Sequence, residues 1–197
     1  SGNGVYSNQA TATGESQFGK STSDLSDSSI DPDPSLPSSD DPTVFVVGEE
    51  PSVGIAKEAV VNESTVTFNY YIENLGNVGL TELTLEDDLD SVFGIGNYVI
   101  ETGPTFIDDP GTIELDTSYD GSFDTAIIKQ PAQEGESVDR TLAVGDTAQI
   151  QLIVKVLTLT DQGGGVGNYS NQVTISAATS NGGSSSDISD SGTDPDP

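Results

Sequence analysis

Apolar and polar residues alternate along several stretches of the chain, and this period of two is typical of β-strands with one buried face. The clearest case is residues 148–156, where Ile150, Leu152 and Val154 share one face. We predict further strands at 1–13, 53–59, 65–72, 80–85, 140–144 and 169–177, with shorter candidates at 98–101 and 125–129. No stretch carries a helical period, so the rest of 90–135 is expected to be loop.

Turn-forming residues lie between these strands. Residues 74–77 read Asn-Leu-Gly-Asn, Gly145 and Asp146 follow another strand, and glycines crowd residues 162–167. Gly and Asn tolerate the backbone angles that tight turns require. About seven short strands with turns between them predict an all-β fold, an antiparallel immunoglobulin-like β-sandwich.

One segment of the chain occurs twice. Tyr6-Ser7-Asn8-Gln9 returns as Tyr169-Ser170-Asn171-Gln172, and Asp31-Pro32-Asp33-Pro34 returns as Asp194-Pro195-Asp196-Pro197, each 163 positions later. A constant period without insertions is the signature of a tandem repeat. We therefore predict that 35–197 is one complete repeat, with a core at 53–178 and an acidic tail at 179–197. Residues 1–34 would be the C-terminal strand and acidic linker of a preceding repeat.

Copies of the repeat are expected to join head to tail, because residues 1–13 match 164–176 and a lone strand needs a partner sheet. The sequence leaves open whether the copies belong to one long polypeptide or to separate subunits that exchange strands. Residues 14–43 are rich in Ser, Asp and Pro, which is the composition of an extended linker. The apolar run at 44–47 is expected to begin the next domain.

The net charge of the chain limits the classes of partner that it can bind. It has 33 acidic residues against 5 Lys and Arg, a formal net charge of −28. This balance argues against nucleic acid and anionic membranes, and it favours divalent cations. The chain has no Cys and no His, so the usual nucleophile–base pairs cannot form and we expect no enzyme activity. No apolar run is long enough for membrane insertion.

Acidic loops predict calcium as a cofactor, because hard cations prefer oxygen ligands. Residues 116–124 carry oxygen side chains at alternate positions, as in the first half of an EF-hand loop, but a solvated turn explains the same pattern. A second candidate is the repeated tail, for which the alternative is a soluble spacer, and a third lies at the end of strand 80–85. The proposed ligands are Asp116, Asp120, Ser122 and Asp124, then Asp24, Asp27, Asp31, Asp33, Asp187, Asp190, Asp194 and Asp196, and finally Asp87 and Asp88.

Several short motifs, taken in order, resemble a family of bacterial surface repeats. They are Thr65-Val66-Thr67-Phe68, Asn74-Leu75-Gly76-Asn77-Val78, Leu80-Thr81, Leu85-Glu86-Asp87, Leu142-Ala143-Val144-Gly145-Asp146 and Tyr169-Ser170-Asn171-Gln172-Val173-Thr174. The family is the conserved repeat known as domain of unknown function eleven, found in tandem in cell-surface adhesins, including those of Bacteroidota. The resemblance covers residues 53–178. It implies an immunoglobulin-like sandwich, an extracellular or cell-surface location and a stalk or adhesive role without catalysis.

Lys57 and Asn171 lie in the first and last predicted strands of the sandwich. In some immunoglobulin-like surface domains, these two strands are joined by a Lys–Asn isopeptide bond that a buried acid promotes. No such acid is evident from the sequence, so an ordinary surface lysine is the favoured interpretation. The isopeptide bond stays open as the alternative.

The leading hypothesis is a structural repeat unit of an extracellular bacterial filament or giant surface adhesin, rigidified by calcium. The alternative is a calcium-dependent carbohydrate-binding module that contacts surface polysaccharide. Sugar sites present exposed aromatic side chains, and the candidates are Tyr98, Phe106, Tyr119 and Phe123.

Overall fold

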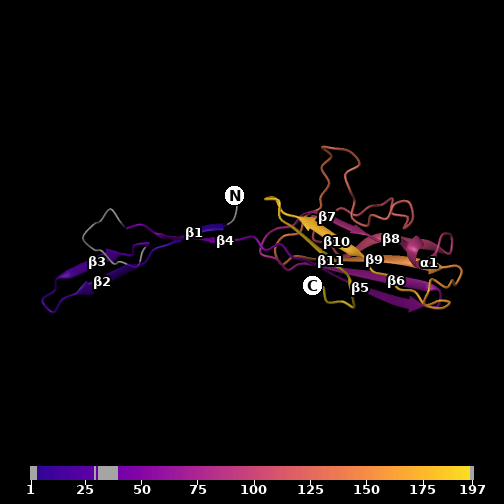
Figure 1. The fold of residues 1–197 in the computed structure, drawn as a ribbon, viewed down its shortest axis with the longest axis horizontal. Coiled ribbons are helices and arrows are strands. Elements are labelled where there is room, and N and C mark those ends of the chain that lie inside the picture. Colours follow the sequence, from indigo (N-terminus) through magenta and orange to yellow (C-terminus); the bar gives the residue numbers. More distant parts are fainter. Residues whose placement is uncertain (1–3, 29, 31–39, 196–197) are drawn as a thin grey trace. The chain divides into compact units, whose positions relative to one another are not determined.

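The chain divides into two compact units, Ser1–Glu49 and Glu50–Pro197. The computed structural model describes residues 4–28, 30 and 40–195. Strands dominate both units (Figure 1). The first unit continues past Pro34, where the repeat pattern places its end, because strands on either side of that point pair with each other.

The first unit consists of two antiparallel strand pairs. Strand β1 (Gly4–Asn8) pairs with β4 (Thr43–Val47), and β2 (Thr11–Glu15) pairs with β3 (Ser21–Leu25). The prediction of a linker over 14–43 was wrong for β3, whose backbone hydrogen bonds to β2 do not require apolar side chains. The apolar run at 44–47 was expected to begin the next domain, but it lies in β4 of this unit.

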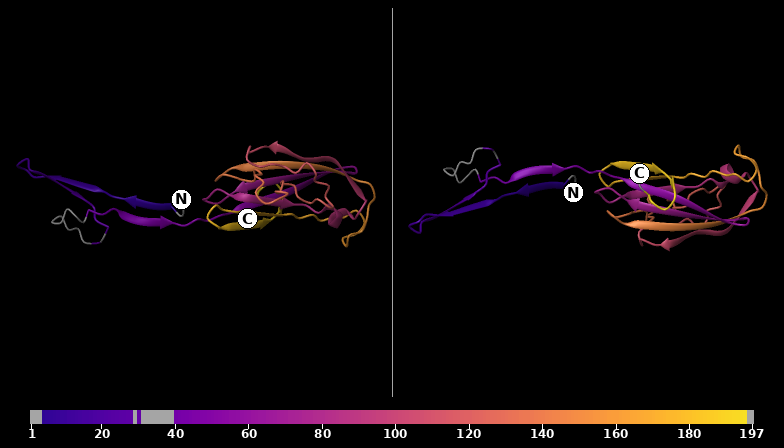
Figure 2. Two further views of the ribbon diagram at one scale, coloured as in Figure 1. Left: turned by 90° about the horizontal axis from the view of Figure 1, so that it is seen from above. Right: turned by 90° about the horizontal axis from the view of Figure 1, so that it is seen from below.

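The second unit is a sandwich of two sheets (Figures 1 and 2). The larger sheet has the order β12-β5-β6-β9-β8, and the smaller has the order β11-β10-β7. Every pairing is antiparallel except that of β12 with β5, so the predicted antiparallel immunoglobulin-like sandwich is confirmed. The strands are β5 (Val53–Asn62), β6 (Thr65–Asn74), β7 (Thr81–Glu86), β8 (Tyr98–Asp108), β9 (Thr147–Val156), β10 (Thr174–Ala178), β11 (Ser184–Ile188) and β12 (Asp190–Ser191).

The core follows the alternation that the sequence predicts. In β6 and β9, every second side chain points between the sheets and the intervening ones are more exposed. The first half of β5 is buried on both faces, because residues near the C-terminus cover its outer side. A Cβ atom on Gly54 would lie 1.9 Å from the carbonyl oxygen of Pro195, so this position accepts only glycine.

Four local expectations were wrong. Strand β8 continues to Asp108, and a one-turn helix, α1 (Leu89–Phe93), follows β7. Residues 125–129 and 140–144 contribute only isolated bridges instead of strands. The predicted acidic tail contains β11 and β12, which belong to the two sheets.

The two sheets of the second unit face each other. In both views of Figure 2, the yellow C-terminal hairpin and the orange β9 lie on opposite sides of this unit.

Candidate site for an isopeptide bond

Three polar residues extend three inward-facing apolar rows. In β5, Lys57 follows Val53 and Ile55 at every second position. Asp87 comes directly after β7 and continues the row of Leu83 and Leu85. Asn171 begins a third row, which continues with Val173 just before β10 and Ile175 within it. Since side chains alternate between faces with a period of two, each of the three points toward the interior between the sheets. Lys57 is 6% exposed and Asp87 is 1% exposed.

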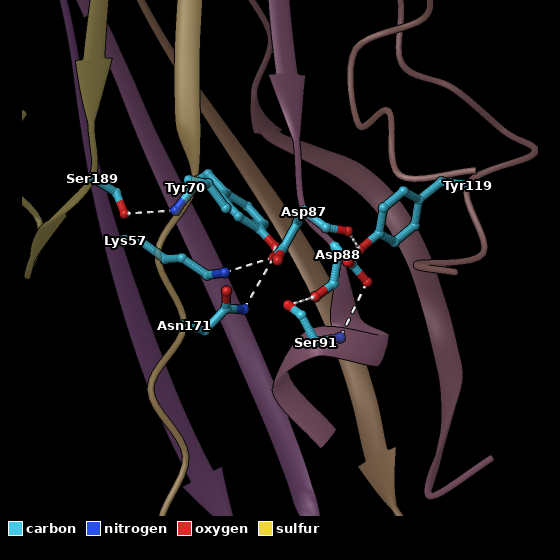
Figure 3. Close-up of polar contacts among 9 residues, drawn as sticks. Lys57, Tyr70, Asp87, Asp88, Ser91, Tyr119, Asn171 and Ser189 are labelled. Atoms are coloured by element: carbon cyan, nitrogen blue, oxygen red, sulfur yellow. Dashed lines mark hydrogen bonds and ion pairs between the residues drawn. The ribbon is translucent and has the colours of Figure 1, made fainter. Parts of the chain in front are cut away.

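The three side chains meet at one atom, Oδ2 of Asp87 (Figure 3). Nζ of Lys57 lies 2.6 Å from this oxygen, and Nδ2 of Asn171 donates a hydrogen bond to it over 3.2 Å. The hydroxyl of Tyr70 donates a third hydrogen bond over 2.6 Å. The second carboxylate oxygen, Oδ1, is buried and has no partner among the described residues.

Backbone contacts fix the position of Asp87. Its N–H donates to the carbonyl oxygen of Thr125 over 2.8 Å, and its own carbonyl accepts from the hydroxyl of Tyr119 over 2.9 Å. The next residue, Asp88, caps helix α1 by accepting from the N–H of Ser91. The backbone of Asp87 is therefore fixed by hydrogen bonds at its own N–H and carbonyl groups and by the helix cap that follows it. Its carboxylate is directed at Lys57.

Aromatic rings enclose the lysine amine. Nζ of Lys57 lies 4.4 Å from the ring centre of Phe68 and 5.0 Å from that of Tyr70. Phe93 packs beside Phe68 and also meets the edge of Tyr169, with ring centres 5.0 Å apart. Tyr169 lies two residues before Asn171, so this contact holds the segment that carries the amide against the core.

The environment changes the acid–base properties of the cluster. Burial lowers the pKa of Lys57 from 10.5 to about 8, although the neighbouring carboxylate of Asp87 opposes the shift. Burial and the same carboxylate raise the pKa of Tyr70 well above its usual value. Burial also raises the pKa of Tyr119. Near neutral pH the tyrosines are therefore hydrogen-bond donors, and a neutral lysine amine is accessible.

The interpretation of Lys57 as a surface residue was wrong, because the row of β5 that it extends faces the core. The buried acid beside Lys57 is Asp87, which the sequence predicts instead as a calcium ligand together with Asp88. One signal could have found it, because Leu83, Leu85 and Asp87 continue a single alternation. An open cavity of about 650 Å³ borders Lys57 and Asn171 and connects the cluster to solvent.

The predicted calcium loop uses its carboxylates in local hydrogen bonds. Asp116 accepts from the N–H and the hydroxyl of Ser118, and that hydroxyl also contacts Asp124. Asp120 accepts from the N–H groups of Ser122 and Asp124, and these bonds lower its pKa. Among the described residues, no group of three or more acidic side chains is placed to hold a metal ion.

The predicted tail ligands that the structure describes have different local surroundings. Oδ2 of Asp187 accepts from the N–H of Ile55 over 2.8 Å, while Asp190 lies in β12 and Asp24 lies in β3. Asp27 has a buried Oδ1, and Asp194 is exposed. The remaining candidates, Asp31, Asp33 and Asp196, lie outside the described residues. Calcium stays a prediction.

No model of a known protein family matches the chain, and no curated protein sequence matches it. Among solved structures, the chain is similar to the major pilin subunit of Bacillus cereus, with 10% sequence identity and a TM-score of 0.41. The match covers 93% of this chain and 63% of the pilin chain.

Proposed function

We propose that the second unit is a structural module of an extracellular bacterial surface filament, and that an isopeptide bond between Lys57 and Asn171 joins its two sheets. The observation that carries this proposal is the shared contact with Asp87. Its Oδ2 lies 2.6 Å from the lysine amine and 3.2 Å from the amide nitrogen of Asn171. The nitrogen that would attack, Nζ of Lys57, and the nitrogen that would leave, Nδ2 of Asn171, therefore both contact the same proton acceptor, Oδ2 of Asp87.

The reaction converts an amine and a primary amide into a secondary amide and ammonia. Lys57 first transfers a proton to Asp87, and the neutral amine attacks Cγ of Asn171. The new C–N bond forms as the amide oxygen takes the negative charge of a tetrahedral intermediate. The proton that Asp87 accepted passes to the Nδ2 group, the Cγ–Nδ2 bond breaks, and ammonia leaves. The lysine nitrogen then gives its remaining extra proton to the Asp87 carboxylate, which leaves a neutral secondary amide and a protonated Asp87. Oδ2 of Asp87 can serve these transfers because it contacts both nitrogens.

The surroundings favour this chemistry over a lasting ion pair. The burial of Lys57 disfavours its charged form, which keeps the nucleophile available. A buried ion pair by itself contributes little to stability, because the cost of removing two charges from water offsets their attraction. Conversion to a neutral amide removes the buried ammonium.

The position of the bond suits a module under tension. Lys57 belongs to the larger sheet, whereas Asn171 lies three residues before β10 of the smaller sheet. A covalent link between them prevents residues 58–170 from being pulled out when force acts on the two ends of the chain. The chain has no Cys, so a disulfide cannot supply the same restraint.

The extracellular filament is supported by properties of the whole chain, in contrast to the isopeptide bond, which is supported by one site. A net charge of −28, the sandwich fold and the repeated hairpin segment suit a soluble, repetitive surface structure. No helix among the described residues is long and apolar enough to cross a membrane. Calcium at the acidic segments would add rigidity by neutralising their carboxylates.

The carbohydrate-binding alternative finds no support in the placement of its aromatic residues. Tyr98 and Tyr119 are 9% and 6% exposed, and both hydroxyls are hydrogen-bonded inside the unit. Phe106 packs against the core, and Phe123 is the exposed member of the four. A flat aromatic platform for sugar rings would need several of these side chains on the surface.

Intact mass spectrometry of the full chain tests the bond directly. We expect a mass lower by one ammonia than the sequence mass, and a branched peptide in which Lys57 is joined to Asn171 after proteolysis. The Asn171→Ala chain should have its full sequence mass, while Asn168→Ala, a change in the same segment, should keep the ammonia loss. A wild-type chain at its full sequence mass would end the proposal.

A further inference from the structure

The hairpin β2–β3 of the first unit has the same construction as the hairpin β10–β11 of the second. Adding 163 to the residue numbers of β2 and β3 gives the bounds of β10 and β11. The strand registers also agree, since Thr11 pairs with Leu25 as Thr174 pairs with Ile188. The turn glycines Gly19 and Gly182 both have positive φ, at 74° and 88°.

Hydrogen bonds outside the strand ladders repeat as well. Ser26 N–H donates to the carbonyl of Ala10 over 2.8 Å, and Ser189 N–H donates to the carbonyl of Val173 over 2.9 Å. The hydroxyl of Ser26 accepts from Ala10 N–H, and that of Ser189 accepts from Val173 N–H. The shared sequence therefore specifies one local structure in two places.

The two hairpins differ in what covers them. In the second unit, β10 pairs with β7, and Val173, Ile175 and Ala177 are 3%, 0% and 5% exposed. Every residue of β2 is exposed, and among the described residues β2 and β3 pair only with each other. An isolated two-stranded hairpin is marginally stable in water, so this hairpin has the structure of a docked element without its sheet.

The side chains that anchor the C-terminal hairpin have counterparts in the N-terminal copy. Asp187, which accepts from the N–H of Ile55, corresponds to Asp24. Tyr169, which packs on Phe93, corresponds to Tyr6, which is 52% exposed. The amide of the candidate bond, Asn171, corresponds to Asn8.

We infer that residues 6–28 close a second copy of the sandwich, residues 50–163, whose own closing hairpin is not in place, and that Asn8 is the amide acceptor for Lys57 of that copy. This inference rests on the proposed isopeptide chemistry. Docking requires the β1–β4 ladder to open, because Asn8 lies opposite Thr43 in it. The step has the same balance as before: the C–N bond to Lys57 forms, the Cγ–Nδ2 bond of Asn8 breaks, and ammonia leaves.

The docked hairpin would make the contacts that its counterpart, β10–β11, makes in the second unit. Strand β2 would pair with β7 of the second copy, and the Asp24 carboxylate would accept the N–H of its Ile55. The bond between Lys57 of the second copy and Asn8 would attach the hairpin covalently to that copy. Since the hairpin's backbone continues into this chain's own sandwich, the two successive sandwiches would be linked covalently. The partner is thus another copy of this chain's own sandwich.

A tandem protein tests the inference on the full chain. Residues 35–163 are placed directly before residue 1, which restores the repeat period and supplies a sandwich without its own hairpin. We expect a mass deficit of two ammonia molecules and two branched peptides, one at Asn171 and one joining Lys57 of the added copy to Asn8. The Asn8→Ala tandem should lose one ammonia, whereas Ser7→Ala, at the adjacent position, should lose two.

The outcomes separate this inference from the proposed function. Loss of one ammonia, at Asn171 alone, would overturn the role of Asn8 and leave the first bond standing, while no loss would overturn both. Hydrogen exchange of Thr11–Glu15 provides a second measurement. We expect these amides to be protected in the tandem protein, including its Asn8→Ala form, and to exchange freely in the chain alone. Equal exchange in all three proteins would overturn docking of the hairpin.

Discussion

Replacing Asn171 with alanine separates a covalent restraint from an ordinary hydrogen bond. The substitution removes one donor to Asp87, and it removes the carbon that Lys57 would attack. Asn171 is only partly buried, so the change should leave little cavity. A hydrogen bond to a charged group contributes about 1.5–3 kcal/mol. If no covalent bond exists, the upper end of this range is the largest loss in unfolding free energy that the substitution should cause.

A covalent bond has a larger effect. The loop closed between positions 57 and 171 is about 114 residues long, and the chain-entropy relation for cross-links assigns about 5 kcal/mol to a loop of that size. For a unit of this size, that difference lowers Tm by roughly 10–20 °C. The unbonded unfolded chain is also less compact, so the denaturant m-value should increase.

Urea and thermal unfolding of wild type, Asn171→Ala and Gln172→Ala supply the comparison. Gln172 lies next to Asn171 and donates a long hydrogen bond of 3.4 Å to the carbonyl of Ser189, so its loss should cost about 1 kcal/mol or less. We expect Asn171→Ala to lose about 5 kcal/mol with a larger m-value. A loss below about 3 kcal/mol with an unchanged m-value would refute the cross-link.

Four further outcomes are expected. Asp87→Asn should give the full sequence mass, since an amide cannot accept the proton of Lys57; an ammonia deficit in this variant would contradict the assigned role. In Asn171→Ala, where Lys57 stays an amine, stability should rise from about pH 8 to about pH 10. The reason is that the folded pKa of about 8 lies below the unfolded 10.5, so the unfolded state binds more protons in that window. Equal melting at both pH values would argue against a buried amine. Gly76→Ala should cost about 1–3 kcal/mol by denaturation, because a Cβ there would lie 2.5 Å from the carbonyl oxygen of Glu50; wild-type stability would contradict the packing. Chelation should lower Tm if calcium neutralises the acidic segments, and identical melting with calcium and chelator would remove that hypothesis.

Strands with regular alternation could be predicted from the sequence, and those that depend on partners could not. Strand β9 alternates throughout, so its burial pattern is visible in the residues themselves. Strand β11 reads Ser-Ser-Ser-Asp-Ile, and its apolar content gives no signal. It is held by backbone bonds to β10 and by Ser185 and Asp187, whose side chains accept from N–H groups of β5. Strand β8 was underestimated because its pairing with β9 is interrupted by irregularities.

The sequence by itself determined the sandwich and the location of the repeated segment. Both are local properties, since alternation and identity at a constant spacing can be read from neighbouring residues. The tertiary structure decided the site. Lys57 and Asn171 lie 30 and 84 positions from Asp87, and only the packing of two sheets brings them onto one carboxylate oxygen. A charged residue at the end of an apolar row faces water if the sheet ends there, and it faces the core if a second sheet covers it. That choice depends on contacts between distant strands.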